Sequence, residues 1–567
     1  MDSNLNSTGR MILVVFLLSI WSARAEIAEP LVTTPLGQVK GTVITSRLAK
    51  SIFSFRGIRY AKAPVNDLRF KPPVPVEKWE GIYNATEDGP LCPQPSSDRV
   101  SEDCLMLNVY STKLPTLSEN PLRPVIVYIH SGGLHSFGGA SYWVGPNYLL
   151  DEDVVLVTFN FRLGTLGFLS TGDKEAPGNN GLRDQVEVLK WVRNNIEYFG
   201  GDPDSVTLMG YSSGAWCVNL HMVSPLSQGL FHKAVAMSGS ILGPWPIPIN
   251  QLEIAKKQAR VLGCPDDTSS NIIKCLKTKS FHEIGESLTK FKEFGNDPII
   301  IWSPVIEPDF GQARFLTAHP IQLITNGLFS KVPFMTGQTK DGYGYLAFNI
   351  VDNETLTQEI NEKFDKNAPI TFLYERNTDF SKKISKTIKS LYLEDKNIEK
   401  SQLKPLAELY ADFLVNFGVN RAAKVISEHS NQSVFYYEFS YQGRYSHFYT
   451  PESNYTMPFG IGQHDDLLYL FYIQKLFPLF KENSPEEVEM VNKLTAIYAN
   501  FAKTGNPIPS PSEKLDNVNW DRFTSGNNKY LEMGSKLVMK ERKPEKRLQE
   551  WEKLYPLSMY QKNKHSH

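Results

Sequence analysis

The sequence has no excess of one charge, few cysteines and no apolar run long enough to cross a membrane. Its 60 Lys and Arg residues almost balance its 61 Asp and Glu residues, which argues against nucleic-acid binding, because that function needs a basic face. The longest apolar run, residues 11–20, spans about 15 Å of a hydrocarbon core that is about 30 Å thick. Of the 567 residues, 41% are hydrophobic and 12% aromatic, so we expect a large, soluble, globular chain.

The first residues have the pattern of a secretory signal peptide. Residues 1–10 are polar, residues 11–20 are apolar, and Ala23-Arg24-Ala25 supplies the small-x-small cleavage pattern. We therefore predict a signal peptide over residues 1–25 and a secreted, extracellular protein without stable membrane insertion. No internal repeat, low-complexity tract or linker follows, so residues 26–567 are expected to form one domain.

The five cysteines fit an oxidising compartment. Cys92 and Cys104 are close in the sequence, as are Cys264 and Cys275, and we predict one disulfide within each pair. Cys217 is left over in an apolar stretch and is expected to be a buried, inert thiol. No spacing resembles zinc ligation, so no metal is expected. Four N-x-S/T tripeptides are candidate glycosylation sites, at Asn84, Asn353, Asn431 and Asn454.

Short apolar segments rich in β-branched residues alternate with longer amphipathic segments, a pattern typical of an α/β protein with a parallel sheet. Residues 182–198 are predicted to form an amphipathic helix that ends at Gly200-Gly201. Residues 251–300 and 352–430 are helix-like and more charged, as expected of insertions that cover a sheet. The predicted strands are Pro124–Ile129, Asp153–Phe159, Ser205–Met209, Lys233–Met237, Val332–Thr336 and Ser433–Phe439.

The segment Gly210-Tyr211-Ser212-Ser213-Gly214 lies between a predicted strand and a helix-like run. This is the context of a G-x-S-x-G nucleophile elbow, in which a sharp turn presents the serine above the sheet. Its glycines are needed where a Cβ would meet neighbouring backbone. The pattern predicts Ser212 as a nucleophile; the alternative is an ordinary glycine-rich turn.

A second loop has the composition of an oxyanion hole. The predicted strand 124–129 runs into His130-Ser131-Gly132-Gly133, which is similar to the H-G-G-G loop of ester hydrolases. The expected oxyanion donors are the backbone N–H groups of Gly132, Gly133 and Ser213. Ser131 replaces the usual first glycine, and His130 is expected to be structural rather than catalytic.

Together these motifs resemble the type-B carboxylesterase family of cholinesterase-like α/β-hydrolases, especially its secreted insect and venom-type members. The resemblance covers essentially all of residues 26–567. It implies an α/β-hydrolase fold, with a large, mostly parallel central sheet, helices on both faces and helical insertions over an active-site gorge. The segments that also follow the family pattern are Ser101-Glu102-Asp103-Cys104-Leu105, Gly178-Asn179-Asn180-Gly181-Leu182 and Phe199-Gly200-Gly201-Asp202-Pro203.

The flanking motifs predict that two of the three positions of the family's catalytic triad are replaced in this chain. The family's glutamate follows an aspartate in G-x-T-x-D-E-x-G, and this chain has Gly342 after Asp341. The family's histidine lies in G-V-x-H-x-D-D-L, and this chain has Gln463 at that position with His464 beside it. A serine without an adjacent base is a weak nucleophile.

Two functions follow from this pattern. The favoured one is a secreted esterase scaffold that is weakly active or a non-catalytic pseudo-esterase, which binds a small hydrophobic ester or ligand in the gorge, or a protein partner. The alternative is an active carboxylesterase in which His464 and Asp341 serve as a displaced base and acid for Ser212. Residues 93–103 contain no aromatic residue for a choline cation, which argues against cholinesterase activity. Neither function needs a cofactor.

Overall fold

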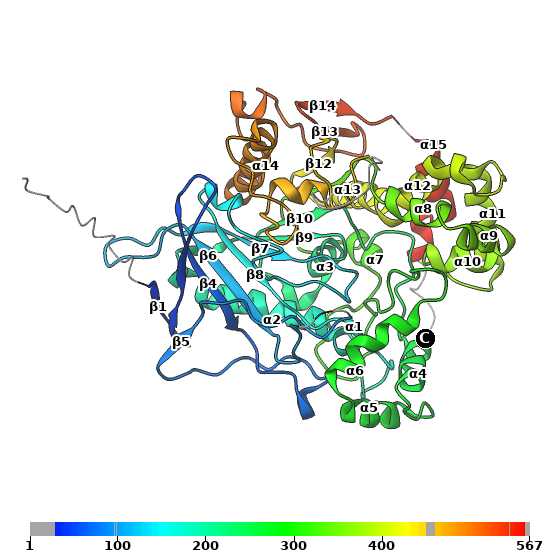
Figure 1. Ribbon diagram of the computed structural model, residues 1–567, viewed down its shortest axis with the longest axis horizontal. Helices are drawn as coiled ribbons and strands as arrows, with labels where there is room; N and C mark the ends of the chain where they lie inside the picture. Colours follow the sequence, from blue (N-terminus) through cyan, green and yellow to red (C-terminus); the bar gives the residue numbers. More distant parts are fainter. Residues whose placement is uncertain (1–28, 96, 98, 449–459, 544, 562–567) are drawn as a thin grey trace, which may run out of the picture.

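A mixed sheet of eleven strands runs through the molecule (Figure 1). The fold is that of a computed structural model, which describes residues 29–95, 97, 99–448, 460–543 and 545–561. The predicted signal peptide, residues 1–25, and the sequon at Asn454 lie outside these residues. In order across the sheet, the strands are β14 (Leu537–Glu541), β13 (Lys529–Met533), β12 (Val434–Phe439), β11 (Phe334–Thr339), β10 (Lys233–Met237), β9 (Gly201–Tyr211), β7 (Arg123–Ile129), β8 (Val155–Phe159), β6 (Met106–Ser111), β4 (Ser51–Arg59) and β3 (Thr42–Thr45).

The six strands expected from the sequence are the six adjacent strands β12, β11, β10, β9, β7 and β8, and every neighbouring pair among them is parallel. These strands are buried on both faces, so each is a nearly continuous apolar run that is visible in the sequence. The sheet continues antiparallel through β6, β4 and β3 on one side. On the other side β13 is parallel to β12, and β14 pairs antiparallel with β13.

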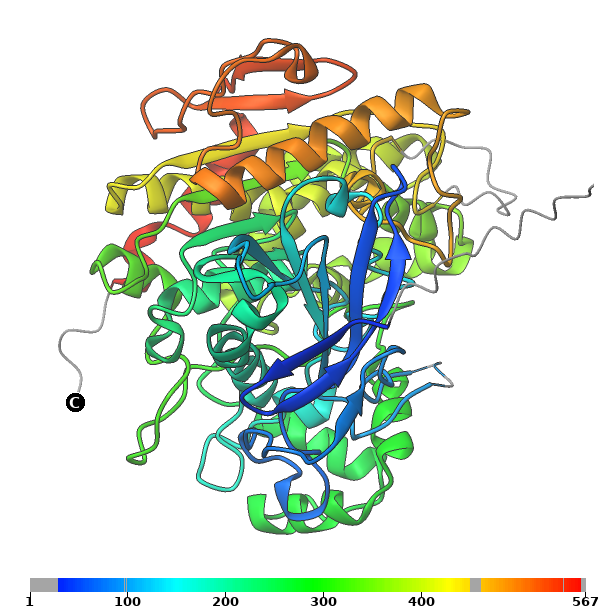
Figure 2. The ribbon, with the colours of Figure 1, turned by 90° about the vertical axis from the view of Figure 1, so that its left-hand side faces the viewer.

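Side chains of the central strands alternate between two cores, one on each face of the sheet. On β7, Val125, Val127 and Ile129 enter the core that contains α2 and α3, whereas Ile126 and Tyr128 enter the core that contains α14. This is the two-residue period of a strand buried on both sides. Figure 2 shows α14 lying along one face of the sheet. The prediction of helices on both faces is confirmed.

The two helix-like segments of the sequence are helical, and helices α9–α12 form a group on one side of the molecule beside α15 (Figure 1). No described helix is both long and apolar enough to span a bilayer. A small separate sheet consists of β1 (Leu31–Thr34), β2 (Gly37–Lys40) and β5 (Ile82–Asn84). The α-helices are α1 (Gly164–Phe168), α2 (Asn180–Asn195), α3 (Ser213–Val223), α4 (Leu252–Val261), α5 (Ser269–Thr278), α6 (Phe281–Glu286), α7 (Pro320–Thr325), α8 (Gly344–Val351), α9 (Glu354–Glu362), α10 (Phe364–Thr371), α11 (Asp379–Leu393), α12 (Leu403–Ala411), α13 (Phe417–His429), α14 (Pro485–Thr504) and α15 (Lys546–Leu554).

Candidate functional site

Ser212 is the single residue between the end of β9 and the start of α3. Its backbone has φ 55° and ψ −118°, a conformation that costs free energy for a residue with a Cβ and that persists only where the surroundings enforce it. The Ser212 N–H donates to the Met237 carbonyl of β10 at 2.9 Å. A Cβ on Gly214 would lie 2.3 Å from the Ile129 carbonyl oxygen, so this position requires glycine. The geometry is that of a nucleophile elbow.

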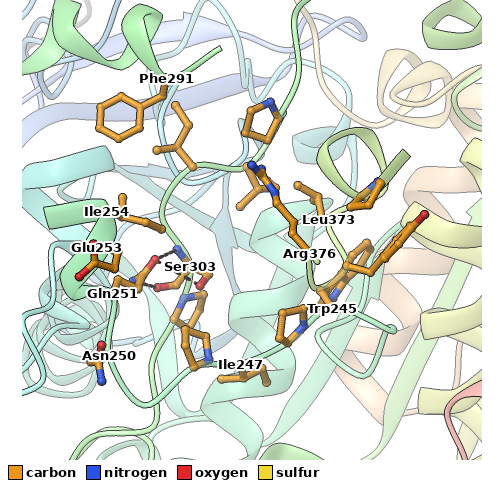
Figure 3. Close-up of a pocket in the computed structure, with 18 of the residues that line it drawn as sticks. Trp245, Ile247, Asn250, Gln251, Glu253, Ile254, Phe291, Ser303, Leu373 and Arg376 are labelled. Atoms are coloured by element: carbon orange, nitrogen blue, oxygen red, sulfur yellow. Dashed lines mark hydrogen bonds between the residues drawn. The ribbon is translucent and has the colours of Figure 1, made fainter. Parts of the chain in front are cut away.

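A cavity of about 480 Å³ begins one helical turn beyond Ser212 (Figure 3). Trp216, whose N–H donates to the Ser212 carbonyl, lines it together with Trp245, which packs on Trp216 with ring centroids 4.8 Å apart. Most of the lining is apolar, and its volume suits a drug-sized molecule. The charged groups in the lining are largely paired, because Arg376 binds Glu293 at 2.7 Å.

The loop after β7 leaves main-chain donors free beside the elbow. Gly132 has φ 112°, and a Cβ there would lie 2.1 Å from the Ser136 carbonyl oxygen, so only glycine fits. The N–H groups of Gly132, Gly133 and Ser213 make no hydrogen bond to a residue that the structure describes. They are therefore available to a developing oxyanion, although their role as an oxyanion hole stays a prediction.

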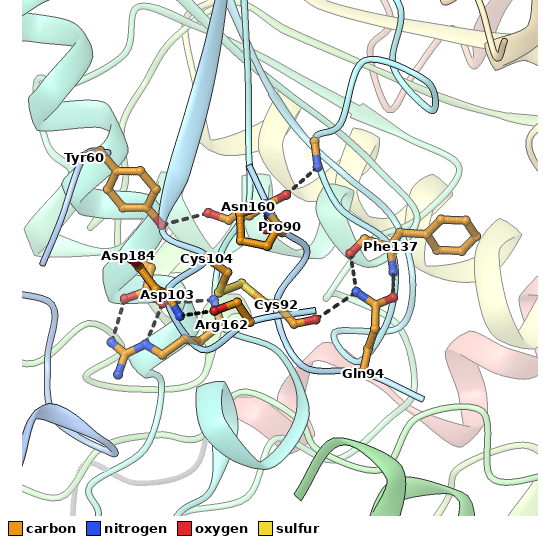
Figure 4. The surroundings of a disulfide bond; sticks show 12 residues. Tyr60, Pro90, Cys92, Gln94, Asp103, Cys104, Phe137, Asn160, Arg162 and Asp184 are labelled. Atoms are coloured by element: carbon orange, nitrogen blue, oxygen red, sulfur yellow. Dashed lines mark hydrogen bonds and ion pairs between the residues drawn. A yellow bond between two sulfur atoms is a disulfide. The ribbon is translucent and has the colours of Figure 1, made fainter. Parts of the chain in front are cut away.

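The disulfide between Cys92 and Cys104 lies near Phe137 of this loop (Figure 4). Cys92 and Cys104 are joined, and so are Cys264 and Cys275, in the pairing predicted from the sequence. The Gln94 side chain donates to the carbonyls of Cys92 and Phe137, each at 3.0 Å, and accepts from the Phe137 N–H at 2.8 Å. The buried Gln94 side chain, hydrogen-bonded through both its nitrogen and its oxygen, thus connects the disulfide loop to the loop that contains Gly132.

The two positions predicted for the acid and the base of the triad lie side by side. Gly342 pairs with Gly462 as a parallel bridge, and the Gln463 N–H donates to the Gly342 carbonyl at 2.8 Å. The Gln463 side chain is fully buried, and its Nε2 donates to the Ser238 carbonyl at 3.0 Å. Ser238 follows Met237, which binds the Ser212 N–H. The Gln463 amide therefore lies close to the elbow, where the flanking motifs place it.

The Ser212 hydroxyl has no base beside it in the described part of the chain. No described imidazole or carboxylate hydrogen-bonds to it; its side-chain partner is the phenol of Tyr343. Burial raises the pKa of Tyr343 above its usual value, so the phenol stays neutral and cannot take up a proton. Sequence reasoning missed Tyr343, because nothing in its neighbourhood signals a contact with a residue 131 positions earlier.

The structure does not bring His464 and Asp341 to Ser212. The Asp341 carboxylate accepts from the Ile461 N–H at 2.8 Å and has no described histidine as a partner. The His464 Nε2 lies 3.2 Å from the Ser131 hydroxyl oxygen. Each of the two side chains thus has a different partner from the one that a displaced triad requires.

The His464 imidazole is held firmly where it lies. Its ring stacks on Tyr211 with centroids 4.8 Å apart, and its main-chain N–H donates to the Tyr211 hydroxyl at 2.6 Å. The His447 ring lies 5.1 Å away. Burial lowers the pKa of His464 to about 4, so the imidazole is neutral at neutral pH.

The other predicted residues have structural surroundings rather than a contact with Ser212. His130 stacks on Phe161, and its Nδ1 bonds to the Ser131 carbonyl at 2.7 Å, so its position is fixed by packing. Cys217 is fully buried, and burial raises the pKa of its thiol to about 12. The candidate glycosylation residues Asn84, Asn353 and Asn431 are exposed, and their modification stays a prediction. Within the described ranges, no group of His, Cys, Asp or Glu is arranged to hold a metal ion.

Comparisons with known proteins identify the family and the fold. The model of the carboxylesterase family matches residues 28–551. A juvenile hormone esterase of Tribolium castaneum is 36% identical over 515 residues, which cover 87% of each chain. Esterase FE4 of Myzus persicae is 36% identical over 496 residues, or 85% of this chain and 86% of that protein. The crystal structure of juvenile hormone esterase from Manduca sexta, with OTFP covalently attached, superposes with a TM-score of 0.81 at 29% identity, covering 93% of this chain and 99% of that chain.

The disulfide between Cys92 and Cys104 is expected to stabilise the fold by about 3 kcal/mol, because it closes a short loop in the unfolded chain. Replacing both residues by alanine should lower the midpoint of guanidinium unfolding accordingly. The matched control is the alanine pair at Cys264 and Cys275, whose sequence separation is 11 rather than 12. This variant should lose a similar free energy of unfolding. If the first variant lost less than about 1 kcal/mol of the free energy of unfolding, the expected stabilisation by loop closure would be contradicted.

Asp466 is expected to make stability depend on pH. Its carboxylate is fully buried next to the Tyr211 hydroxyl, and burial raises its pKa to about 7. A carboxyl pKa that is higher in the folded than in the unfolded state makes stability fall as the pH rises from about 4 to about 7. Asp466→Asn removes this charge, so its melting temperature relative to wild type should be higher at pH 8 than at pH 5.

The control for this measurement is Asp352→Asn at an exposed aspartate, which should leave the pH dependence unchanged. An Asp466→Asn variant whose relative melting temperature is the same at both pH values would show that the pKa of the buried carboxyl is not raised, because the group would then be ionised in the folded protein already at pH 5.

Proposed function

The chain belongs to the carboxylesterase family, and we propose that it is an extracellular pseudo-esterase, which retains the fold and a ligand-binding cavity of that family but hydrolyses esters at Ser212 slowly or not at all. This proposal is carried by one observation: a buried glutamine amide, hydrogen-bonded to the Ser238 carbonyl, lies where the base is expected.

The chemical consequence follows from what an amide can do. The Gln463 side chain cannot accept a proton from Ser212 and return it near neutral pH. In a serine hydrolase, removal of the histidine costs roughly 10⁶ in kcat, and removal of the acid as well costs little more, because the three groups act as a unit. Free oxyanion donors at Gly132, Gly133 and Ser213 would leave about 10³–10⁴ over the reaction in water.

The cavity beside Trp216 and Trp245 supports a small, apolar ligand of the ester class. Its volume of about 480 Å³ and its largely paired charges favour burial of a hydrophobic molecule rather than of an ion. The relatives named above are esterases, which supports a ligand of the same chemistry. We also propose that residues 1–25 direct export and that Asn84, Asn353, Asn431 and Asn454 carry glycans.

Restoring the triad is expected to restore turnover. The variant Gln463→His with Gly342→Glu should hydrolyse p-nitrophenyl acetate at least about 10² faster than wild type, because it returns a base and its orienting carboxylate to the elbow. Gly342 has φ 46°, and a Cβ there would lie 3.1 Å from the Ala411 Cβ. Adding Ala411→Gly relieves this contact and should raise the rate further.

The control is the same variant with Ser212→Ala, which should lose the gain. Wild-type protein should in addition react slowly at Ser212 with an active-site organophosphonate, as shown by peptide mass spectrometry. Wild-type turnover of many per second that disappears in Ser212→Ala would overturn the proposal.

A further inference from the structure

Ser131 is the second serine in this region whose hydroxyl could act as a nucleophile, and it is the one that has an imidazole beside it. We propose that Ser131 and His464 form a nucleophile–base pair that accepts small acyl groups from activated esters. This inference concerns a different hydroxyl from Ser212, and it can hold or fail separately from the function proposed above.

The contact has the geometry of an activated serine. The His464 Nε2 lies 3.2 Å from the Ser131 Oγ. The same imidazole also hydrogen-bonds to the main-chain carbonyl of Gln463. A carbonyl only accepts, so the ring nitrogen that faces it carries the hydrogen. In the tautomer with that hydrogen on Nδ1, the lone pair of Nε2 points to the serine hydroxyl. A base that is oriented by a third group is the arrangement that activates a serine.

Both members of the pair are fixed by their surroundings. The stacking of His464 on Tyr211 and the hydrogen bond from its N–H to the Tyr211 hydroxyl hold the ring in place. The Ser131 carbonyl bonds to the His130 imidazole at 2.7 Å, which fixes the backbone of the serine. Little side-chain entropy is therefore lost when a substrate binds.

The His464 imidazole is in its neutral, proton-accepting form. The groups that face His464 are Tyr211 and His447, and Asp465 and Asp466 follow it in the chain. Burial also lowers the pKa of His447 well below its usual value, so no cation lies next to the His464 ring. With a pKa of about 4, His464 is neutral above pH 5, so its lone pair is free to take the hydroxyl proton, as a weaker base than an exposed imidazole.

A small cavity adjoins the pair and limits the substrate. It has a volume of about 50 Å³ and is lined by Ser131 and His464, together with the aromatic side chains of Phe137 and Trp143. We expect a cavity this small to favour an acetyl group over a long acyl chain. His130, which also lines the cavity, has its Nε2 buried without a partner among the described residues, so the cavity offers a polar acceptor for a water molecule.

The reaction balances with water as the co-substrate. The Ser131 oxygen attacks the ester carbonyl carbon while its proton passes to His464 Nε2. The bond to the leaving alcohol then breaks, and the alcohol departs with that proton. Water, deprotonated by the same nitrogen, attacks the acyl-serine, which releases the carboxylic acid and restores the hydroxyl.

The test is to map the acyl group on the full-length protein after a short exposure to p-nitrophenyl acetate, with peptide mass spectrometry as the readout. We expect acetylation of Ser131 in wild type and in Ser212→Ala, and none at residue 131 in Ser131→Gly, which carries the residue usual in the family. His464→Gln should lower the acetylation rate at least 100-fold. p-Nitrophenyl hexanoate should react at least tenfold more slowly than the acetate.

Two controls separate this chemistry from unspecific reaction. Ser136→Ala removes a hydroxyl on the same loop that donates to the Gly132 carbonyl and has no imidazole partner, and it should leave the rate unchanged. Between pH 5.5 and 8 the rate should be constant, whereas an exposed histidine base would lose activity below about pH 6.5.

The outcomes are distinguishable. Acetyl found at Ser212 alone would overturn both this inference and the proposed loss of activity at Ser212. Acetyl found at neither serine would overturn the present inference and leave the proposed function standing. A rate that is unchanged in His464→Gln, with each variant folded as judged by circular dichroism, would show that Ser131 is not activated by this imidazole.

Discussion

The backbone pairing of the segment at Gly342 with the segment at Gly462 determines the chemistry of the site. Three main-chain or side-chain contacts join the two segments: Gln463 N–H to Gly342 O, Asp341 N–H to Ile461 O, and Ile461 N–H to the Asp341 carboxylate. This register fixes which residue of each segment is directed to the elbow. The side chain of Gln463 donates to the Ser238 carbonyl, whereas the side chain of the next residue, His464, contacts the Ser131 hydroxyl. A shift of one residue therefore changes the partner of the side chain altogether.

The same register explains why neighbours cannot replace the missing groups. Asp341 is already used by the backbone: its carboxylate satisfies the Ile461 N–H, and a rotation toward the elbow would leave that group unpaired. The His464 ring stacks on Tyr211, and its Nε2 lies against the Ser131 hydroxyl. The ring cannot turn to the other side of the chain without losing both contacts. Loss of a buried hydrogen bond costs about 1–3 kcal/mol, which is enough to keep each side chain where it lies.

The sequence predicted the parts of this structure that depend on local pattern. The six central strands were visible because burial on both faces makes them apolar throughout, and the elbow was visible because its glycines are required by close backbone approach. The flanking strands β13 and β14 carry charged residues on partly exposed faces and gave no such pattern. The partners of His464 and Asp341 depend on residues 333 and 120 positions away, which no local pattern encodes.

Ser131 and His464 are residues far apart in the sequence that meet in space. At the first position of the loop the family pattern has glycine, yet Ser131 is not among the residues with a positive φ, so its Cβ is accommodated without strain. The added hydroxyl lies against His464, and an imidazole in that place gives the serine a partner that a glycine could not use. The chain thus carries a serine without a base at the elbow and a serine with a base in the adjoining loop.

The cavity lined by Trp216 and Trp245 indicates that the chain can bind a ligand without hydrolysing it. A pocket that binds substrate and transition state equally well lowers the ligand dissociation constant but does not accelerate a reaction. Trp216 and Trp245 contact a ligand through apolar surface, which does not distinguish an ester from its tetrahedral intermediate. Of the groups that would make that distinction, the free N–H donors of Gly132, Gly133 and Ser213 are present. The base at position 463 and the carboxylate at position 342 are not, because this chain has an amide and a glycine there. Retention of the apolar cavity beside such an elbow is therefore consistent with selection for binding rather than for rapid hydrolysis at Ser212.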